Sequence, residues 1–234
     1  MGARGMPVRR RSAWRAWPLL VLAVVLASGA PAEAASTTVQ AGPTTRHEVA
    51  LTFDDGWDVV ACARITSMLR ANGAVGTFFI NGVYVNGAPA AWRSALRGMD
   101  VGNHTRAHPD LTKLSSAEIR HQIASNERVI EKILRRPMLK LLRPPYGSYD
   151  DRVVRIARSL GYRRIVLWSN DTLDWMPSAT VSGVVSRGTA GGNGAIVLMH
   201  CGPQVTVRAL PAIIRSYQRR GYRLVGLGHL LGRH

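Results

Sequence analysis

The sequence has few of the features that mark a disordered, membrane-spanning or nucleic-acid-binding protein. Only 19% of its 234 residues are charged, which is too few for a disordered chain. After the first 35 residues there is no low-complexity tract, no repeat of fixed period, and no apolar stretch of the about 20 residues that a membrane span needs. The 31 basic residues are scattered, with three lysines among them, and form no dense run interleaved with aromatics. We therefore expect no nucleic-acid partner.

The first 34 residues have the order of a secretory signal peptide. A basic start with five arginines precedes an apolar run over residues 18–27, and Ala32-Glu33-Ala34 offers an A-x-A cleavage site. A retained N-terminal membrane anchor is the alternative, although the apolar run is short for a span. The sequence therefore predicts a secreted or extracytoplasmic protein that has no contact with the membrane after cleavage.

The net charge is formally +17, and removal of the leader leaves +13. For an exported protein, an anionic cell envelope is a natural partner of such a charge. A general bias of the sequence towards arginine explains the same excess. We expect a monomer.

Residues 35–46 are small and polar, and they are expected to be a linker to a single domain over residues 47–234. Apolar residues make up 46% of the sequence, enough for the core of one such domain. Strands are expected at residues 49–53, 75–80, 101–103, 139–142, 164–168, 195–199 and 222–227. Helices are expected at residues 59–72, 88–97, 115–134, 148–160, 178–187 and 206–220, with a short one at the C-terminus.

This alternation of strands and helices predicts a parallel sheet with helical crossovers. Seven such strands close most naturally into a distorted (β/α) barrel, and an open doubly wound sheet is the alternative. Two helix starts carry clear signals. Ser115 and Glu118 form a capping box, and Ser148 and Asp151 are expected to cap the helix that ends at Leu160.

Polar side chains gather where the predicted strands end. The set consists of Asp54, Asp55, His104, His108, Arg143, Asp171, Asp174 and His200. In a parallel α/β barrel, the carboxyl ends of the strands form the rim where active sites are built. Polar residues are common at strand ends, but that tendency explains one or two residues and not so many acids and histidines together.

A metal site is the first chemistry that these residues predict. His104 and His108 are four residues apart, so one helical turn would face both imidazoles the same way. Two imidazoles and the carboxylate of Asp55 suit one divalent ion, with Zn²⁺ expected and Co²⁺ as a substitute, and leave positions for water and substrate. Asp54 points elsewhere and is predicted to be the general base for a metal-activated water. Each motif has an alternative interpretation when it is considered alone. Asp-Asp-Gly is typical of a turn, and H-x-x-x-H can be two surface histidines.

Five segments, in order, resemble the signatures of the polysaccharide deacetylases, also called the NodB homology domain or carbohydrate esterase family 4. They are Thr52-Phe53-Asp54-Asp55-Gly56, His104-Thr105-Arg106-Ala107-His108, Arg143-Pro144-Pro145-Tyr146, Asp171-Thr172-Leu173-Asp174-Trp175 and Leu198-Met199-His200. The resemblance covers residues 47–231. It implies a distorted barrel and a metal-dependent hydrolase that removes acetyl groups from N-acetylated glycan, such as peptidoglycan or a chitin-like oligosaccharide.

The resemblance also implies individual roles. Asp54 is the catalytic base and His200 the catalytic acid, oriented by Arg143 and Asp174 respectively. The substrate-binding residues are Tyr146, whose backbone N–H helps to hold the oxyanion, and Trp175 and Leu198, which line a pocket for the acetyl methyl group.

Other functions compete with this one. Within the family, an acetylxylan esterase would cleave O-acetyl groups instead. Two histidines and a carboxylate also suit a non-haem iron oxygenase, but that enzyme is expected on an all-β double sheet. A non-enzymatic wall-binding module is disfavoured because every proposed catalytic position is filled.

Three features go beyond the motifs. Trp57 stands where many members have proline, and it either stacks on sugar or packs. The loops are short, which indicates an open groove. The two cysteines lie just beyond the proposed base and acid, so we hypothesise a disulfide between Cys62 and Cys201; two free thiols, with Cys62 buried in its helix, are the alternative.

Overall fold

The strand β2 (Glu48–Asp55) lies inside the sheet and is buried along almost its whole length. The computed structural model describes residues 1–2 and 37–232, so the predicted signal peptide lies outside the described residues except for its first two. Residues 35–234 belong to one unit. No helix in the described part of the chain is both long and apolar enough to cross a membrane.

The sheet is parallel throughout its ladders and follows the order β1-β6-β5-β4-β3-β2-β8-β7, with β9 added beside β2. The other strands are β1 (Thr37–Val39), β3 (Thr77–Ile80), β4 (Asp100–Asn103), β5 (Leu141–Leu142), β6 (Arg164–Val166), β7 (Asn170–Asp171), β8 (Ile196–His200) and β9 (Arg223–Leu224). All seven predicted strands are present in a curled sheet with helical crossovers. The predicted single-domain, distorted (β/α) barrel is confirmed.

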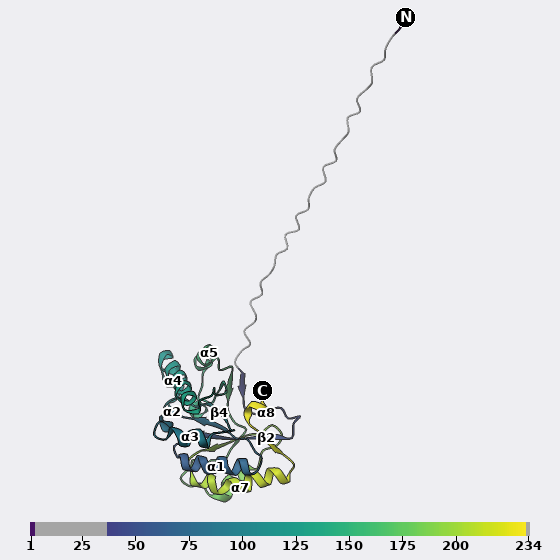
Figure 1. Ribbon diagram of the computed structural model, residues 1–234. Helices are drawn as coiled ribbons and strands as arrows, with labels where there is room; N and C mark the ends of the chain where they lie inside the picture. Colours follow the sequence, from purple (N-terminus) through teal and green to yellow (C-terminus); the bar gives the residue numbers. More distant parts are fainter. Residues whose placement is uncertain (3–36, 233–234) are drawn as a thin grey trace. The chain divides into compact units, whose positions relative to one another are not determined.

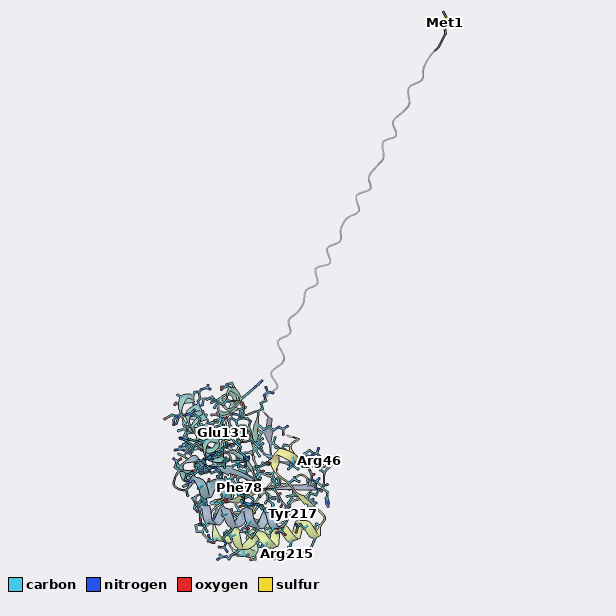
Figure 2. All side chains as sticks on the ribbon, in the orientation of Figure 1. Met1, Arg46, Phe78, Glu131, Arg215 and Tyr217 are labelled. Carbon is cyan, nitrogen blue, oxygen red and sulfur yellow. A yellow bond between two sulfur atoms is a disulfide. The ribbon has the colours of Figure 1, made fainter. Side chains whose placement is uncertain are left out.

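The helices are α1 (Val59–Ala71), α2 (Gly82–Val85), α3 (Pro89–Ala95), α4 (Ser116–Leu134), α5 (Asp151–Ser159), α6 (Val181–Gly188), α7 (Gln204–Arg219) and α8 (Leu227–Leu230). Figure 1 shows α1 and α7 side by side on one flank of the sheet, where they contact each other. On α7, Tyr217 is buried towards the core and Arg215 is exposed at the outer edge (Figure 2).

The helix starts test the capping predictions. The capping box of α4 is confirmed, since Ser115 Oγ accepts from Glu118 N and Glu118 accepts from Ser115 N. The prediction for α5 was wrong, because Asp150 is its N-cap and accepts from Val153 N at 2.8 Å. Several short polar side chains stand together there, and each is a competent cap.

Two strands and one helix were not predicted. The expected linker, residues 35–46, contains β1, which pairs with β6, and Gly42 N beyond it donates to Gly194 O at 2.7 Å. The expectation of a linker was therefore wrong for this part of the segment. Small and polar residues suit a short strand at the end of a sheet, so composition did not separate it from a linker. β7 and α2 have two and four residues and are too short for a periodic pattern.

The apolar core fixes the strand register that builds the site. The rings of Phe53 and Phe78 stack with centroids 4.9 Å apart between β2 and the helices that cover it. In this register Asp54 of β2 lies beside His200 of β8. Because the strands are parallel, their carboxyl ends meet at one rim of the barrel.

Candidate active site

A pocket of about 380 Å³ opens at the carboxyl rim of the barrel. Its lining consists of Asp54, Asp55, His104, His108, Pro144, Tyr146, Trp168, Asp171, Trp175, Leu198 and His200. Eight of the ten predicted site residues are in this lining, and Arg143 and Asp174 lie buried behind it. A larger cavity of about 580 Å³ lies beside β9, towards the amino end of β2, and contains none of the predicted site residues.

Three side chains on the pocket floor converge as metal ligands would. Asp55 Oδ1 lies 3.4 Å from His108 Nε2 and 3.5 Å from His104 Nε2, and one potential ligand atom from each residue lies within 4.8 Å of the others. Asp55 Oδ1 is buried and has no hydrogen-bond partner in the described residues. Buried polar atoms are usually paired, so this oxygen is available to bind a cation. These residues therefore fit a divalent metal.

The hydrogen bonding of His104 and the charge of Asp55 also suit the binding of a cation. His104 Nδ1 lies 2.7 Å from Arg143 O and donates to it, so Nε2 is the ring nitrogen that faces Asp55. Burial acts to raise the pKa of Asp55, but His104, His108 and His200 outweigh it and hold that pKa below its usual range. Asp55 is therefore a carboxylate at neutral pH.

The two histidines are brought together by a loop and not by the helical turn that was expected. After β4 the chain adopts left-handed backbone conformations at Thr105 (φ 68°) and His108 (φ 59°). Two buried asparagines hold this loop: Asn81 Nδ2 donates to His104 O at 2.5 Å, and Asn103 Oδ1 accepts from Thr105 N at 2.9 Å. Sequence reasoning missed both asparagines.

Asp54 has one oxygen fixed and one facing the metal-ligating group. Arg143 Nη1 donates to Asp54 Oδ1 at 2.7 Å and to Thr52 Oγ1 at 2.8 Å. The other nitrogens of Arg143 donate to the carbonyl oxygens of Val166 and Leu167, so the fully buried guanidinium is held in place. Asp54 Oδ2 lies 3.7 Å from His104 Nε2. A carboxylate in this position could accept a proton from an attacking water molecule.

His200 lies beside Asp54 in the register and is held by Asp174. The distance from His200 Nδ1 to Asp174 Oδ1 is 2.7 Å, and His200 N donates to Asp174 Oδ2 at 2.8 Å. The hydroxyl of Thr206 donates to the same Oδ2. Burial acts to lower the pKa of His200, but the hydrogen bond and charge of Asp174, then Asp54 and Asp55, raise it to about 9. The ring is therefore an imidazolium at neutral pH and can donate a proton.

The walls of the pocket are apolar. Leu198 is buried at its base, and the largely exposed rings of Trp175 and Tyr146 stand at its edge. The Tyr146 ring meets the His108 ring edge-on, with centroids 4.7 Å apart. Trp168 borders the same pocket and was missed by sequence reasoning, as was Thr206, because neither lies in a recognised motif.

The structure joins Cys62 of α1 to Cys201 as a disulfide, with their Cα atoms 5.2 Å apart and both side chains buried. Cys201 directly follows His200, and its N–H donates to Asp54 O at 2.8 Å. The pair therefore ties the loop that carries His200 to the helix behind Asp54.

We expect this bond in the purified protein, with no titratable thiol in denatured, unreduced chains of monomeric mass. The cysteines are 139 residues apart, so in the chain-entropy model the bond stabilises the fold by about 4–5 kcal/mol, or less where strain opposes it. Reduction should accordingly lower the melting temperature. Two thiols per chain before reduction would rule the bond out.

Comparisons with known proteins agree with this geometry. The family model described as polysaccharide deacetylase matches residues 41–165. The peptidoglycan-N-acetylglucosamine deacetylase of Bacillus cereus is 34% identical over 193 residues, covering 80% of this chain and 69% of that protein. The chitooligosaccharide deacetylase of a Bradyrhizobium species is 32% identical over 199 residues, covering 79% and 90%.

A solved structure shows the same fold. The crystal structure of the Bc1960 peptidoglycan N-acetylglucosamine deacetylase, in complex with 4-naphthalen-1-yl-N-oxidanyl-benzamide, superposes with a TM-score of 0.79 at 30% identity. The match covers 84% of this chain and 94% of the other. The chain therefore belongs to the polysaccharide deacetylase family, carbohydrate esterase family 4.

Proposed function

We propose that this protein is an extracytoplasmic, metal-dependent hydrolase that removes acetyl groups from N-acetylglucosamine units of peptidoglycan or a chitin-like oligosaccharide. The observation that carries the proposal is the meeting of three groups at one pocket. A metal-ligating trio, the free oxygen of Asp54 and the imidazolium of His200 all face the space where a scissile bond would lie.

Asp55, His104 and His108 would hold the cation, which supplies Lewis-acid polarisation of the acetyl carbonyl and a water of lowered pKa. Zn²⁺ suits this donor set, with Co²⁺ as a substitute. Asp54 accepts the proton of the attacking water, and Arg143 keeps its carboxylate oriented. The backbone N–H of Tyr146 helps to stabilise the charge that develops on the carbonyl oxygen.

His200 completes the hydrolysis on the other side of the bond. Its Nε2–H gives a proton to the leaving nitrogen as the C–N bond breaks, and Asp174 stabilises the imidazolium until then. The products are acetate and a free amine on the sugar. Leu198 and Trp175 form an apolar wall against which the acetyl methyl group can pack.

Two observations support N-deacetylation over the acetylxylan alternative. An amine leaves poorly without a proton, and His200 is held as an imidazolium whose pKa is about 9. The matched relatives are a peptidoglycan-N-acetylglucosamine deacetylase from Bacillus cereus and a chitooligosaccharide deacetylase from Bradyrhizobium. The parallel sheet with helical crossovers does not support the iron oxygenase, for which a double β-sheet is expected.

The test is release of acetate from peptidoglycan, N-acetylglucosamine oligomers and acetylated xylan, each with added Zn²⁺ or Co²⁺. We expect release from the N-acetylated substrates and little from xylan. Release from xylan alone would favour the esterase, and release from none would count against both functions.

The pH dependence of turnover follows from His200. A general acid must be protonated, so kcat should hold at neutral pH and fall as pH rises through the pKa of His200, which is about 9 when no cation is bound. A bound cation repels the imidazolium and moves this limb to lower pH.

Asp174→Asn should move the limb further down, because the ring loses its carboxylate partner. To test the assignment, profiles of kcat against pH are compared for the wild type, this variant and Asp151→Asn, which changes an exposed carboxylate of α5. A limb that stays in place in Asp174→Asn would contradict it.

A further inference from the structure

Trp57 is an exposed aromatic side chain beside the catalytic pocket. It has no role in the proposed reaction. It lies just beyond β2 and is 45% exposed, whereas tryptophan is usually well buried. Its ring centroid is 6.4 Å from that of His200, and the two rings are inclined by 33°. Trp57 is not part of the lining of the acetyl pocket. It therefore lies beside His200 but outside the pocket proposed to hold the acetyl group.

The indole is supported by the chain that follows His200. A Cβ atom built on Gly202 would lie only 2.1 Å from Trp57 Cε2, so the ring rests directly on the backbone at this glycine. A side chain at position 202 would displace the ring. The loop beneath is fixed in turn by the Cys62–Cys201 disulfide.

The backbone on the other side of Trp57 is also fixed. Asp58 caps α1 by accepting from Val60 N at 2.9 Å and Ala61 N at 3.1 Å, and Gln204 Nε2 at the start of α7 lies 3.4 Å from its other oxygen. Trp57 is thus a large apolar surface on a rigid support. Little conformational entropy is lost when a ligand lies against such a surface.

We propose that Trp57 is a platform for a sugar ring next to the one that carries the acetyl group, and so determines the preference for longer glycans. The inference rests on the proposed function. In the proposed reaction His200 protonates the leaving nitrogen, and this nitrogen is bonded to the sugar. The glycan, and not the acetyl methyl group, therefore lies next to His200. The C–H-rich face of a pyranose is apolar and matches the face of an indole.

Stacking of a neighbouring sugar adds binding energy in the ground state and the transition state alike. Trp57→Ala should therefore raise KM for an N-acetylglucosamine tetramer by roughly 5- to 10-fold and change kcat by less than about twofold. Trp57→Phe keeps an aromatic face and should recover part of the loss. Hydrolysis of a small acetyl ester without a sugar reports the reaction centre alone, so the loss should be confined to the glycan.

Tyr84→Ala is the matched control, because Tyr84 is 43% exposed on α2 and is not part of the lining of the catalytic pocket. An unchanged tetramer KM in Trp57→Ala, with an active wild type, would overturn the platform and leave the proposed function intact. Equal losses on the small ester and the tetramer would show a structural role and also overturn it. A wild type that cleaves the ester but no N-acetylated glycan would refute the proposed function, and the platform with it.

Discussion

His104→Ala is expected to abolish both metal binding and acetate release. The imidazole is buried at the floor of the pocket, its Nδ1 is fixed by Arg143 O, and its Nε2 faces Asp55. Its removal leaves two of the three ligands and a water-sized gap in the metal site, and loss of a ligand removes the activation of water as well. Metal content by elemental analysis and acetate release are measured on the same preparation.

The matched control is His121→Ala, which removes an exposed histidine of α4. It should retain both metal and activity. Because the loop at His104 is densely bonded, a melting curve must show that His104→Ala is folded. A folded variant that keeps one metal per chain and near wild-type turnover would contradict the assignment of His104.

Asp54→Asn is expected to lower kcat by about 10²- to 10⁴-fold while the metal stays bound. The amide has nearly the shape of the carboxylate, but it cannot take a proton from water. Metal content should be retained because the proposed ligand set is Asp55, His104 and His108 and does not include Asp54. Loss of turnover with the metal retained would separate the role of Asp54 from that of its neighbour Asp55.

Asp58→Asn is the control for this change, since asparagine also caps a helix and α1 should be unaffected. Asp54→Asn leaves the buried Arg143 without its anionic partner, so its melting temperature is recorded together with kcat. Turnover near that of the wild type would show that Asp54 is not the base. Loss of the metal would show that it is a ligand.

The strands that the sequence predicted are those with a clear apolar pattern and a helix after them. β2 and β8 are long, buried and flanked by turns, so periodicity was sufficient. β1 and β7 exist because a neighbouring strand offers hydrogen-bond partners. Strands of three and two residues have too little local pattern to be predicted, because the partner strands that stabilise them are set by the tertiary fold.

The site was predictable as a set of residues, because parallel strands bring their carboxyl ends to one rim. Its detailed geometry was not. Left-handed conformations at Thr105 and His108 replaced the helical turn considered for this segment. The loop is held by a hydrogen bond that Asn81 donates and one that Asn103 accepts. Thr206 reaches Asp174 from a helix 32 residues further along the chain. Contacts of this kind have no signal in local sequence.

The central claim is that a divalent metal at Asp55, His104 and His108 drives deacetylation of an N-acetylated glycan. Its most direct test is acetate release from N-acetylglucosamine oligomers before chelation, after exhaustive chelation, and after addition of Zn²⁺ or Co²⁺, with metal content measured at each step. The account predicts one metal per chain, loss of acetate release with the metal, and recovery on its return. Full activity in a preparation with no detectable metal would contradict it.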